Sequence, residues 1–165
     1  MKNEKTAGFG TKKRTDGVPR ILIDTNVMVY LFDGRDRLRQ DQAALVLRYL
    51  EKTNQGQLSA QCLAEFFNAT TRGPRPFLPR AEAFLHVQRW LSIYPVFPIT
   101  DSIVLEAARG ARDYNLAYYD AQIWASAHLN QINIIFSEDF QDGQLLEGVR
   151  FVNPFSPKFQ LERWA

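Results

Sequence analysis

Four acidic residues have the type and placement of catalytic groups in an α/β chain: Asp24, Glu65, Asp120 and Asp139. Asp24 directly follows a short apolar run, and Asp139 comes three residues after another, so both stand where ligands collect beyond the carboxyl ends of strands. Asp120 stands at the start of a predicted helix. Glu65 interrupts the most apolar predicted helix, where an ionised carboxylate is costly to bury unless a cation or strong donors meet it.

Taken singly, these acids have simpler structural explanations. An aspartate between a strand and a helix often caps the helix, which applies to Asp24 and Asp120, and Asp139 fits a surface turn. Taken together, converging carboxylates repel and raise one another's pKa unless a cation lies between them. Carboxylate oxygens suit Mg²⁺ or Mn²⁺, which can activate water and stabilise a phosphodiester under attack. The set therefore favours metal-assisted hydrolysis of nucleic acid.

Composition excludes several other classes of protein. A length of 165 residues with 45% hydrophobic and 23% charged residues is typical of one folded globular domain. The longest apolar run, residues 27–32, is far shorter than the roughly 20 residues that span a bilayer, and no apolar segment follows the N-terminal lysines. We expect no membrane association and a cytoplasmic location. One cysteine and two histidines exclude an internal disulfide, a cysteine zinc site and a histidine-rich metal centre.

Positive charge gathers in two segments. Residues 1–20 hold six basic and two acidic residues with three glycines, which predicts a flexible basic N-terminal arm. Residues 72–80 hold three prolines and three arginines that we expect to contact RNA phosphates: Arg72, Arg75 and Arg80. Phe77 is the one aromatic residue among them that could stack on a base.

Apolar spacing predicts strands alternating with helices. The expected strands are residues 21–23, 57–59, 95–99 (an edge strand, because of its prolines), 132–136 and 149–152. The expected helices begin near residues 27, 41, 60, 80, 100 and 119. Such alternation implies an α/β fold, a three-layer α/β/α arrangement with a mostly parallel twisted central sheet.

Two of these helices are expected to bury broad apolar faces. On the helix of residues 80–93, the inward face comprises Ala83, Phe84, Val87, Trp90 and Leu91. On the next helix, it comprises Ile103, Val104, Ala107 and Ala108. The first of these helices carries more large apolar residues than one face needs, which favours self-association.

Four short segments resemble the acidic motifs of PIN-domain nucleases. They are Ile21-Leu-Ile-Asp24-Thr-Asn26, Leu63-Ala-Glu65-Phe-Phe-Asn68, Tyr119-Asp120-Ala121 and Ile134-Ile-Phe-Ser137-Glu-Asp139. Their order and spacing are similar to the family's over residues 21–154, which would be the nuclease domain between the arm and a C-terminal tail of residues 155–165. The chain looks most like the VapC-type toxins of toxin-antitoxin pairs.

The resemblance implies an activity and a site. The activity is a metal-dependent endoribonuclease that hydrolyses RNA to 5′-phosphate and 3′-hydroxyl ends. Asp24, Glu65, Asp120 and Asp139 would line a site for Mg²⁺ or Mn²⁺. Asn26 and Ser137 would orient the ligands, and Asp142 would be a further outer acid. An antitoxin protein and a homodimer partner are also implied.

Two other hypotheses remain open from the residues. The same fold can serve as a catalytically silent RNA- or protein-binding module in which an ion only stabilises. It can also act on a small phosphate ester through Asp24 as the phosphate acceptor, although asparagine at position 26 replaces the second aspartate expected there. Cys62 is predicted to be a small core residue and His128 a helix-surface or packed histidine, and neither is predicted to be catalytic.

Overall fold

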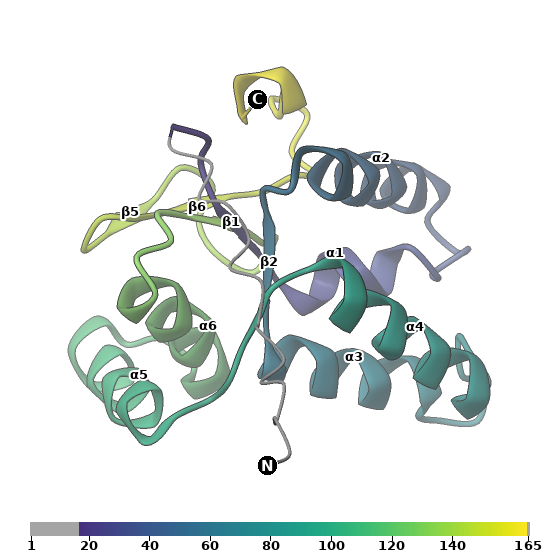
Figure 1. Ribbon diagram of the computed structural model, residues 1–165, viewed down its shortest axis with the longest axis horizontal. Helices are drawn as coiled ribbons and strands as arrows, with labels where there is room; N and C mark the ends of the chain where they lie inside the picture. The colour runs from purple at the N-terminus through teal and green to yellow at the C-terminus, as the bar shows by residue number, and fades with distance from the viewer. Residues whose placement is uncertain (1–16, 165) are drawn as a thin grey trace, which may run out of the picture.

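A six-stranded sheet forms the middle layer of the protein, whose computed structural model describes residues 17–164 (Figure 1). Its strands are β1 (Ile21–Ile23), β2 (Gly56–Ser59), β3 (Val96–Phe97), β4 (Ile134–Phe136), β5 (Leu145–Leu146) and β6 (Val149–Val152). They lie in the order β3-β2-β1-β4-β6-β5, and only β5 and β6 pair antiparallel. The predicted, mostly parallel sheet is confirmed. Most of the predicted basic arm, residues 1–16, lies outside the described residues.

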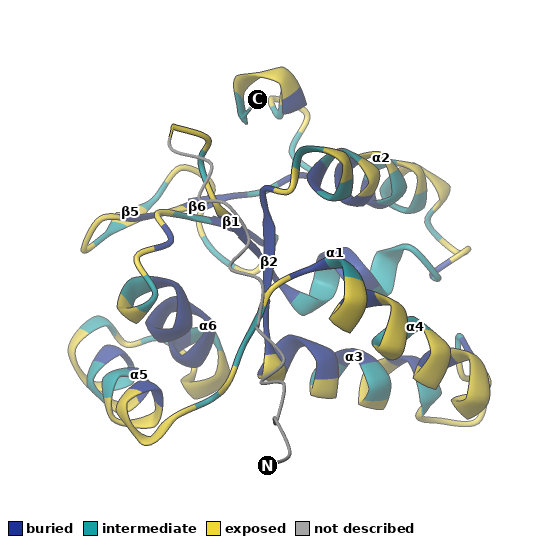
Figure 2. Ribbon diagram, in the orientation of Figure 1, coloured by how far each residue is buried: buried dark blue, intermediate teal, exposed yellow. Residues whose placement is uncertain are grey.

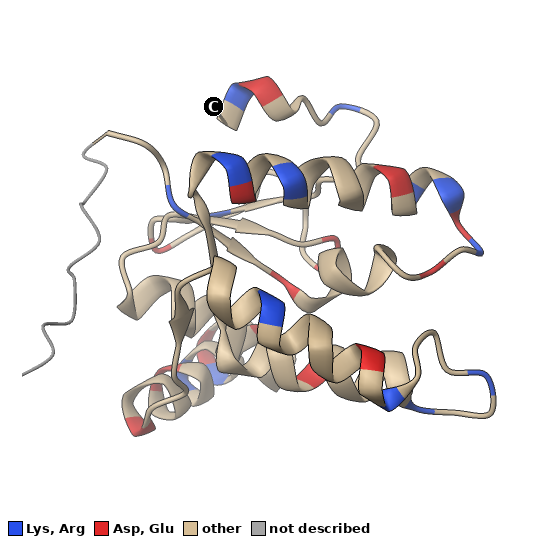
Figure 3. Cartoon of the chain, turned by 45° about the vertical axis from the view of Figure 1, so that its right-hand side comes forward, with Lys and Arg blue, Asp and Glu red and all other residues tan. Residues whose placement is uncertain are grey.

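Helices cover both sides of this sheet. They are α1 (Thr25–Tyr30), α2 (Arg37–Thr53), α3 (Ala60–Thr71), α4 (Arg80–Ile93), α5 (Asp101–Tyr114), α6 (Tyr118–Leu129) and a final 3-10 helix, Leu161–Trp164. Helix α2 lies over one side and α3 to α6 over the other (Figure 3), so the predicted three-layer α/β/α arrangement is confirmed. Of the described helices, none is long and apolar enough to cross a membrane.

Strands β1 and β4 at the centre of the sheet position the acidic residues. Every residue of β1 is fully buried, as expected for a parallel strand covered on both faces. Ile23 lies opposite Phe136, and the amide of Asp24 extends this pairing by donating to the Phe136 carbonyl at 3.0 Å. The two strands therefore end at the same level, and the residues that follow them emerge side by side.

The largest differences from the sequence prediction are the start of α2 and the presence of β5, while β3 and β4 are shorter than predicted and α1 begins at Thr25. Helix α2 begins at Arg37, four residues earlier than expected, because Asp36 caps it by accepting from the Arg39 amide at 3.1 Å. Its first turn carries no buried apolar residue, so periodicity gave no signal there. Strand β5 is absent from the prediction. It joins β6 through a tight turn in which Glu147 and Gly148 both have positive φ angles, of 44° and 83°.

The expected inward faces of α4 and α5 are wrong in part. On α4, Ala83 and Trp90 are buried, but Phe84 and Leu91 are 55% and 54% exposed. Much of the α4 ribbon is exposed (Figure 2). On α5, Val104 and Ala108 are also exposed. Each of these helices packs mainly against one neighbour, α4 against α3 and α5 against α6, so only a narrow stripe of each is covered.

The segment after β6 packs against β4 and against the residue that precedes β2. The ring of Phe136 in β4 meets the rings of Phe159 and Trp164 edge-on, at centroid distances of 5.5 and 5.9 Å. The carbonyl of Trp164 also accepts a hydrogen bond of 2.6 Å from Gln55, next to β2. This C-terminal segment thus braces the strand that leads to Ser137 and Asp139.

Close packing of α5 against α6 requires glycine at position 110. A Cβ atom there would lie 2.8 Å from the fully buried ring of Trp124. We expect Gly110→Ala to lower the free energy of unfolding by about 1–2 kcal/mol, because the overpacking outweighs the gain in helix propensity. Urea denaturation measures this. Gly34→Ala, where nothing lies within 4 Å, is the control, and equal stability of the two variants would contradict the prediction.

Candidate metal centre

Asp24 is both the helix cap and the centre of the acidic cluster. Its Oδ1 accepts from the Thr25 amide at 2.6 Å, which caps α1. Its Oδ2 accepts from the Ser137 hydroxyl at 2.6 Å and from Asn26 Nδ2 at 3.2 Å. Only 5% of the residue is exposed. Capping and a place in the acidic cluster are therefore not alternatives at this position.

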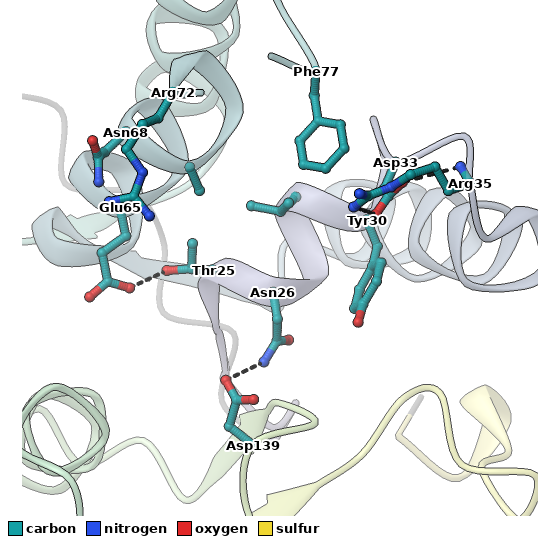
Figure 4. Close-up of a pocket in the computed structure, with 12 residues that line it drawn as sticks. Thr25, Asn26, Tyr30, Asp33, Arg35, Glu65, Asn68, Arg72, Phe77 and Asp139 are labelled. Atoms are coloured by element: carbon teal, nitrogen blue, oxygen red, sulfur yellow. Dashed lines mark hydrogen bonds and ion pairs between the residues drawn. The ribbon is translucent and has the colours of Figure 1, made fainter. Parts of the chain in front are cut away.

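Asn26 and Ser137 connect Asp24 to Asp139. The Nδ2 group of Asn26 donates to Asp139 Oδ2 at 3.0 Å (Figure 4). It also lies within hydrogen-bond distance of Ser137 Oγ, at 3.1 Å, and of Asp24 Oδ2, at 3.2 Å. The Ser137 hydroxyl also accepts from the Asp139 amide at 3.1 Å. These two polar side chains hold the carboxylates that follow β1 and β4 in one fixed arrangement.

Glu65 reaches the same site from α3. Its Oε2 accepts from the Thr25 hydroxyl at 2.8 Å, and its Oε1 accepts from Gln61 Nε2 at 2.8 Å. Gln61 Nε2 also donates to the Tyr119 carbonyl at 3.0 Å. Because Tyr119 directly precedes Asp120, Gln61 ties the acid of α3 to the first turn of α6.

Electrostatics shows that the four acids share one environment. Burial raises the pKa of Asp24 to about 7, hydrogen bonds from Ser137 and Thr25 lower it, and the carboxylates of Asp139 and Glu65 raise it again. The pKa of Asp120 is raised first by burial and then by Asp139 and Glu65. Each of the four acids is thus close enough to at least one of the others to influence its ionisation.

The donor set fits a hard divalent cation. It offers carboxylate oxygens from four residues and two buried amide oxygens, Asn26 Oδ1 and Gln61 Oε1, that have no hydrogen-bond partner among the described residues. The amide nitrogens of both residues donate to carboxylates. Rotating either amide by half a turn would therefore place its oxygen against a carboxylate and lose that hydrogen bond. Oxygen-only ligation by the carboxylates is the preference of Mg²⁺ and Mn²⁺.

Among the described residues, the group that brings three possible ligand atoms within 4.8 Å of one another lies at the other end of α6, and the four acids above do not meet that distance. Glu106, His128 and Glu147 lie within ligand distance of one another, but Arg109 Nη2 donates to both glutamates at 2.6 Å. The His128 ring stacks on Trp124 at a centroid distance of 5.1 Å, so it is packed, as expected. The arginine already neutralises this cluster, which we interpret as an ion-pair network.

The remaining predicted site residues lie at varying distances from the cluster. Asp142 is exposed and accepts from the Asn153 amide at 2.9 Å, which ties the turn after β4 to the end of β6. Arg72 lines a pocket that also borders Glu65 and Asp139. Arg75 and Arg80 are exposed and do not line that pocket.

Sequence reasoning missed a clamp beside Asp139. The neighbouring Glu138 accepts from the Tyr30 hydroxyl and pairs with Arg39 at 3.2 Å, and Arg39 also donates to the Tyr30 hydroxyl at 2.6 Å. Burial and this contact with Glu138 raise the pKa of Tyr30 to about 12. The turn carrying Asp139 is thereby fixed to α1 and α2. Glu138 beside Asp139 was the only signal that the sequence offered.

Residues 21–141 match the family model of the PIN domain. The chain belongs to the PIN domain family. The matched region contains all four acids of the cluster, together with Asn26 and Ser137. The predicted family membership is thus confirmed. No protein with a curated description matches the chain.

Solved structures share the fold of this PIN domain protein. A toxin-antitoxin complex from Klebsiella pneumoniae is 21% identical, with a TM-score of 0.57 over 81% of this chain and 97% of that one. FitAcB from Neisseria gonorrhoeae is 17% identical, with a TM-score of 0.57 over 82% and 98%. The Sarcin-Ricin loop cleaving toxin VapC20 of Mycobacterium tuberculosis is 20% identical, with a TM-score of 0.58 over 79% and 98%.

Removing the Asp24 charge should stabilise the metal-free protein. The unfolded chain ionises Asp24 near pH 3.8 and the folded chain near pH 7, so the parent loses stability as pH rises through this window and carries the full penalty above it. Asn at this position cannot ionise. At pH 8 in EDTA, we expect Asp24→Asn to be about 2–4 kcal/mol more stable, measured by urea denaturation. A variant less stable than the parent would contradict this.

Divalent ions should stabilise the parent selectively. A ligand present at about 100 times its Kd adds about 2.7 kcal/mol to the free energy of unfolding. We expect Mg²⁺ or Mn²⁺ to raise the Tm of the parent and to have a much smaller effect on Asp24→Asn, as measured by calorimetry. The control is Glu106→Gln, which alters the cluster at the far end of α6. If Glu106→Gln loses the metal response while Asp24→Asn keeps it, the metal binds at Glu106, His128 and Glu147, and our assignment is wrong.

Proposed function

We propose that this PIN domain protein is a metal-dependent endoribonuclease whose Asp24, Glu65, Asp120 and Asp139 hold Mg²⁺ or Mn²⁺. The observation that carries the proposal is the placing of Asp24 and Asp139 beyond the ends of β1 and β4, where Glu65 of α3 and Asp120 of α6 are near enough to share in their electrostatic repulsion. Such an arrangement is unfavourable without a cation and well suited to one. Family membership supports the same conclusion.

The chain's own residues would prepare the site for hydrolysis. A bound divalent ion would lower the pKa of a water and neutralise charge that develops on the phosphate. Thr25, Ser137 and Asn26 orient the carboxylates of Asp24 and Asp139 through their hydrogen bonds. Glu65, fixed by Thr25 and Gln61, either completes the ligand set or accepts a proton from the attacking water. The expected products carry 5′-phosphate and 3′-hydroxyl ends.

We propose that three arginines, Arg72, Arg75 and Arg80, contact phosphates of the RNA. Arg72 lines the pocket beside Glu65, and Arg75 and Arg80 are exposed on and after the loop that follows α3. Contacts to the RNA backbone give affinity without sequence readout, so these side chains would position the strand and not select it. Asp142 would act from outside the cluster, through the turn that it holds.

We further propose that the protein is the toxin of a toxin-antitoxin pair, acts in the cytoplasm and forms a homodimer. The similar structures include a toxin-antitoxin complex and a toxin described as cleaving the Sarcin-Ricin loop, which supports the toxin proposal through the shared fold. Exposed Phe84, Leu85 and Leu91 on α4 support self-association. Co-expression with the product of the adjacent reading frame tests the antitoxin, and light scattering tests the dimer.

Cleavage of structured and single-stranded RNAs in Mg²⁺, Mn²⁺ and EDTA tests the central proposal. We expect metal-dependent cutting that Asp24→Asn reduces more than about 100-fold, because a metal ligand is lost. Asp113→Asn removes a surface carboxylate that pairs with Arg112 on α5 and should leave the rate unchanged. Equal activity of Asp24→Asn and the parent would refute the assignment. RNA binding without turnover under any metal would favour the binding module.

A further inference from the structure

The acidic cluster opens into a pocket of about 450 Å³, a size typical of ligand sites. Asn26, Glu65 and Asp139 border it at the acidic end. Phe77 and Arg35 also line the pocket, away from these acids. Figure 4 shows the Phe77 ring above α1 and the Arg35 side chain beside Asp33. The hydrolytic chemistry proposed above uses only the acidic end, so the remainder of the pocket has no assigned role.

We propose that this remainder seats an unpaired nucleobase of the RNA, next to the cleaved phosphodiester, which stacks on Phe77 and Arg35. The proposal rests on the proposed ribonuclease function and adds a base-binding subsite to it, at Phe77 and Arg35. In a duplex the bases are paired and stacked inside the helix. A recessed aromatic ring can be reached only by a base that has left that stack.

Arg35 and Phe77 together form a stacking platform. The guanidinium carbon of Arg35 lies 4.8 Å from the centroid of the Phe77 ring. Asp33 holds the guanidinium in place by accepting from Nε at 2.7 Å and from Nη2 at 2.6 Å. The Arg35 side chain is nevertheless 78% exposed, so an incoming base can reach it without unfolding the loop. Aromatic faces and guanidinium planes are the surfaces on which unpaired bases stack.

The backbone around Phe77 is anchored, so the ring is presented in a defined position. Pro76 and Pro79 restrict the chain on either side of it. The next residue, Leu78, is buried, and its amide donates to the Thr70 carbonyl at 3.0 Å near the end of α3. A rigid aromatic side chain costs little conformational entropy on binding, which suits a stacking contact.

One face of α3 provides the side wall of the pocket. Glu65, Asn68, Ala69 and Arg72 lie at helical spacing along it, and all four line the pocket. Along this wall, the acid Glu65 is followed about two helical turns later by the cation Arg72. An RNA strand needs this order, because the scissile phosphate approaches the carboxylates through a metal ion while a neighbouring phosphate needs a cation of the protein.

Binding of short single-stranded RNAs that carry 2-aminopurine at successive positions tests the pocket, with Asp24→Asn protein used to prevent cleavage. We expect quenching at one position, caused by stacking, and affinity about tenfold lower for Phe77→Leu. Phe77→Trp should retain both, which separates loss of stacking from loss of folding. Leu105→Ala changes an exposed apolar residue on α5 that does not line the pocket and should have no effect.

Three results would overturn the proposal: no quenching at any position, equal affinity of Phe77→Leu and its Asp24→Asn parent, or equally tight binding of a blunt RNA duplex. Cleavage by protein with Asp24 intact, measured on the same RNAs, separates the two proposals. Quenching without metal-dependent cleavage would sustain the base pocket and refute the nuclease. If Phe77→Leu cleaves RNA with the same kcat/KM as the parent, the nuclease is sustained and the base pocket is refuted. The same result is expected if Phe77 binds a protein partner and not RNA.

Discussion

Repulsion among buried carboxylates is the constraint on which the rest of this structure depends. Asp24 is almost fully enclosed while Asp139 and Glu65 act on it with like charge. Hydrogen bonds from Ser137 and the Thr25 amide offset part of that cost, and they require β1 and β4 to end at the same level. Sheet register is therefore as much a part of the site as the acids themselves, since a slip of one residue would turn Asp24 to the other face.

Elements far from the acids serve the same arrangement. Phe159 and Trp164 pack against Phe136 and so brace β4, while the clamp formed by Glu138, Tyr30 and Arg39 fixes the turn that follows it. On the other side, Gln61 joins α3 to the start of α6. Asp24, Glu65 and Asp139 are thus each carried by a different element and held by a hydrogen bond to another, and Gln61 fixes the residue that precedes Asp120.

Local patterns predicted what depends on local chemistry. The all-apolar β1, the proline-flanked edge strand β3 and the acids at strand and helix ends follow from periodicity, missing donors and the chain order of the motifs. What depends on tertiary contact could not be predicted in this way. The exposure of Phe84 and Leu91 reflects how little of α4 its neighbour covers, and the Gln61 bridge depends on where α6 begins. Likewise, α2 begins where the Asp36 side chain caps it, and its first turn has no buried apolar residue from which the start could be predicted.

The hydrogen bonds of Asn26 leave the metal-free site locally frustrated. Its amide nitrogen carries two hydrogens but faces three acceptors, on Asp24, Ser137 and Asp139, at 3.0–3.2 Å. One acceptor is always left short, and the amide oxygen of the same side chain lacks any partner within residues 17–164. The surrounding sheet and helices are mutually consistent and fix this mismatch in place. Folding alone thus leaves the hydrogen bonds of Asn26 incompletely satisfied, and a bound ligand would decide which of its three acceptors it serves.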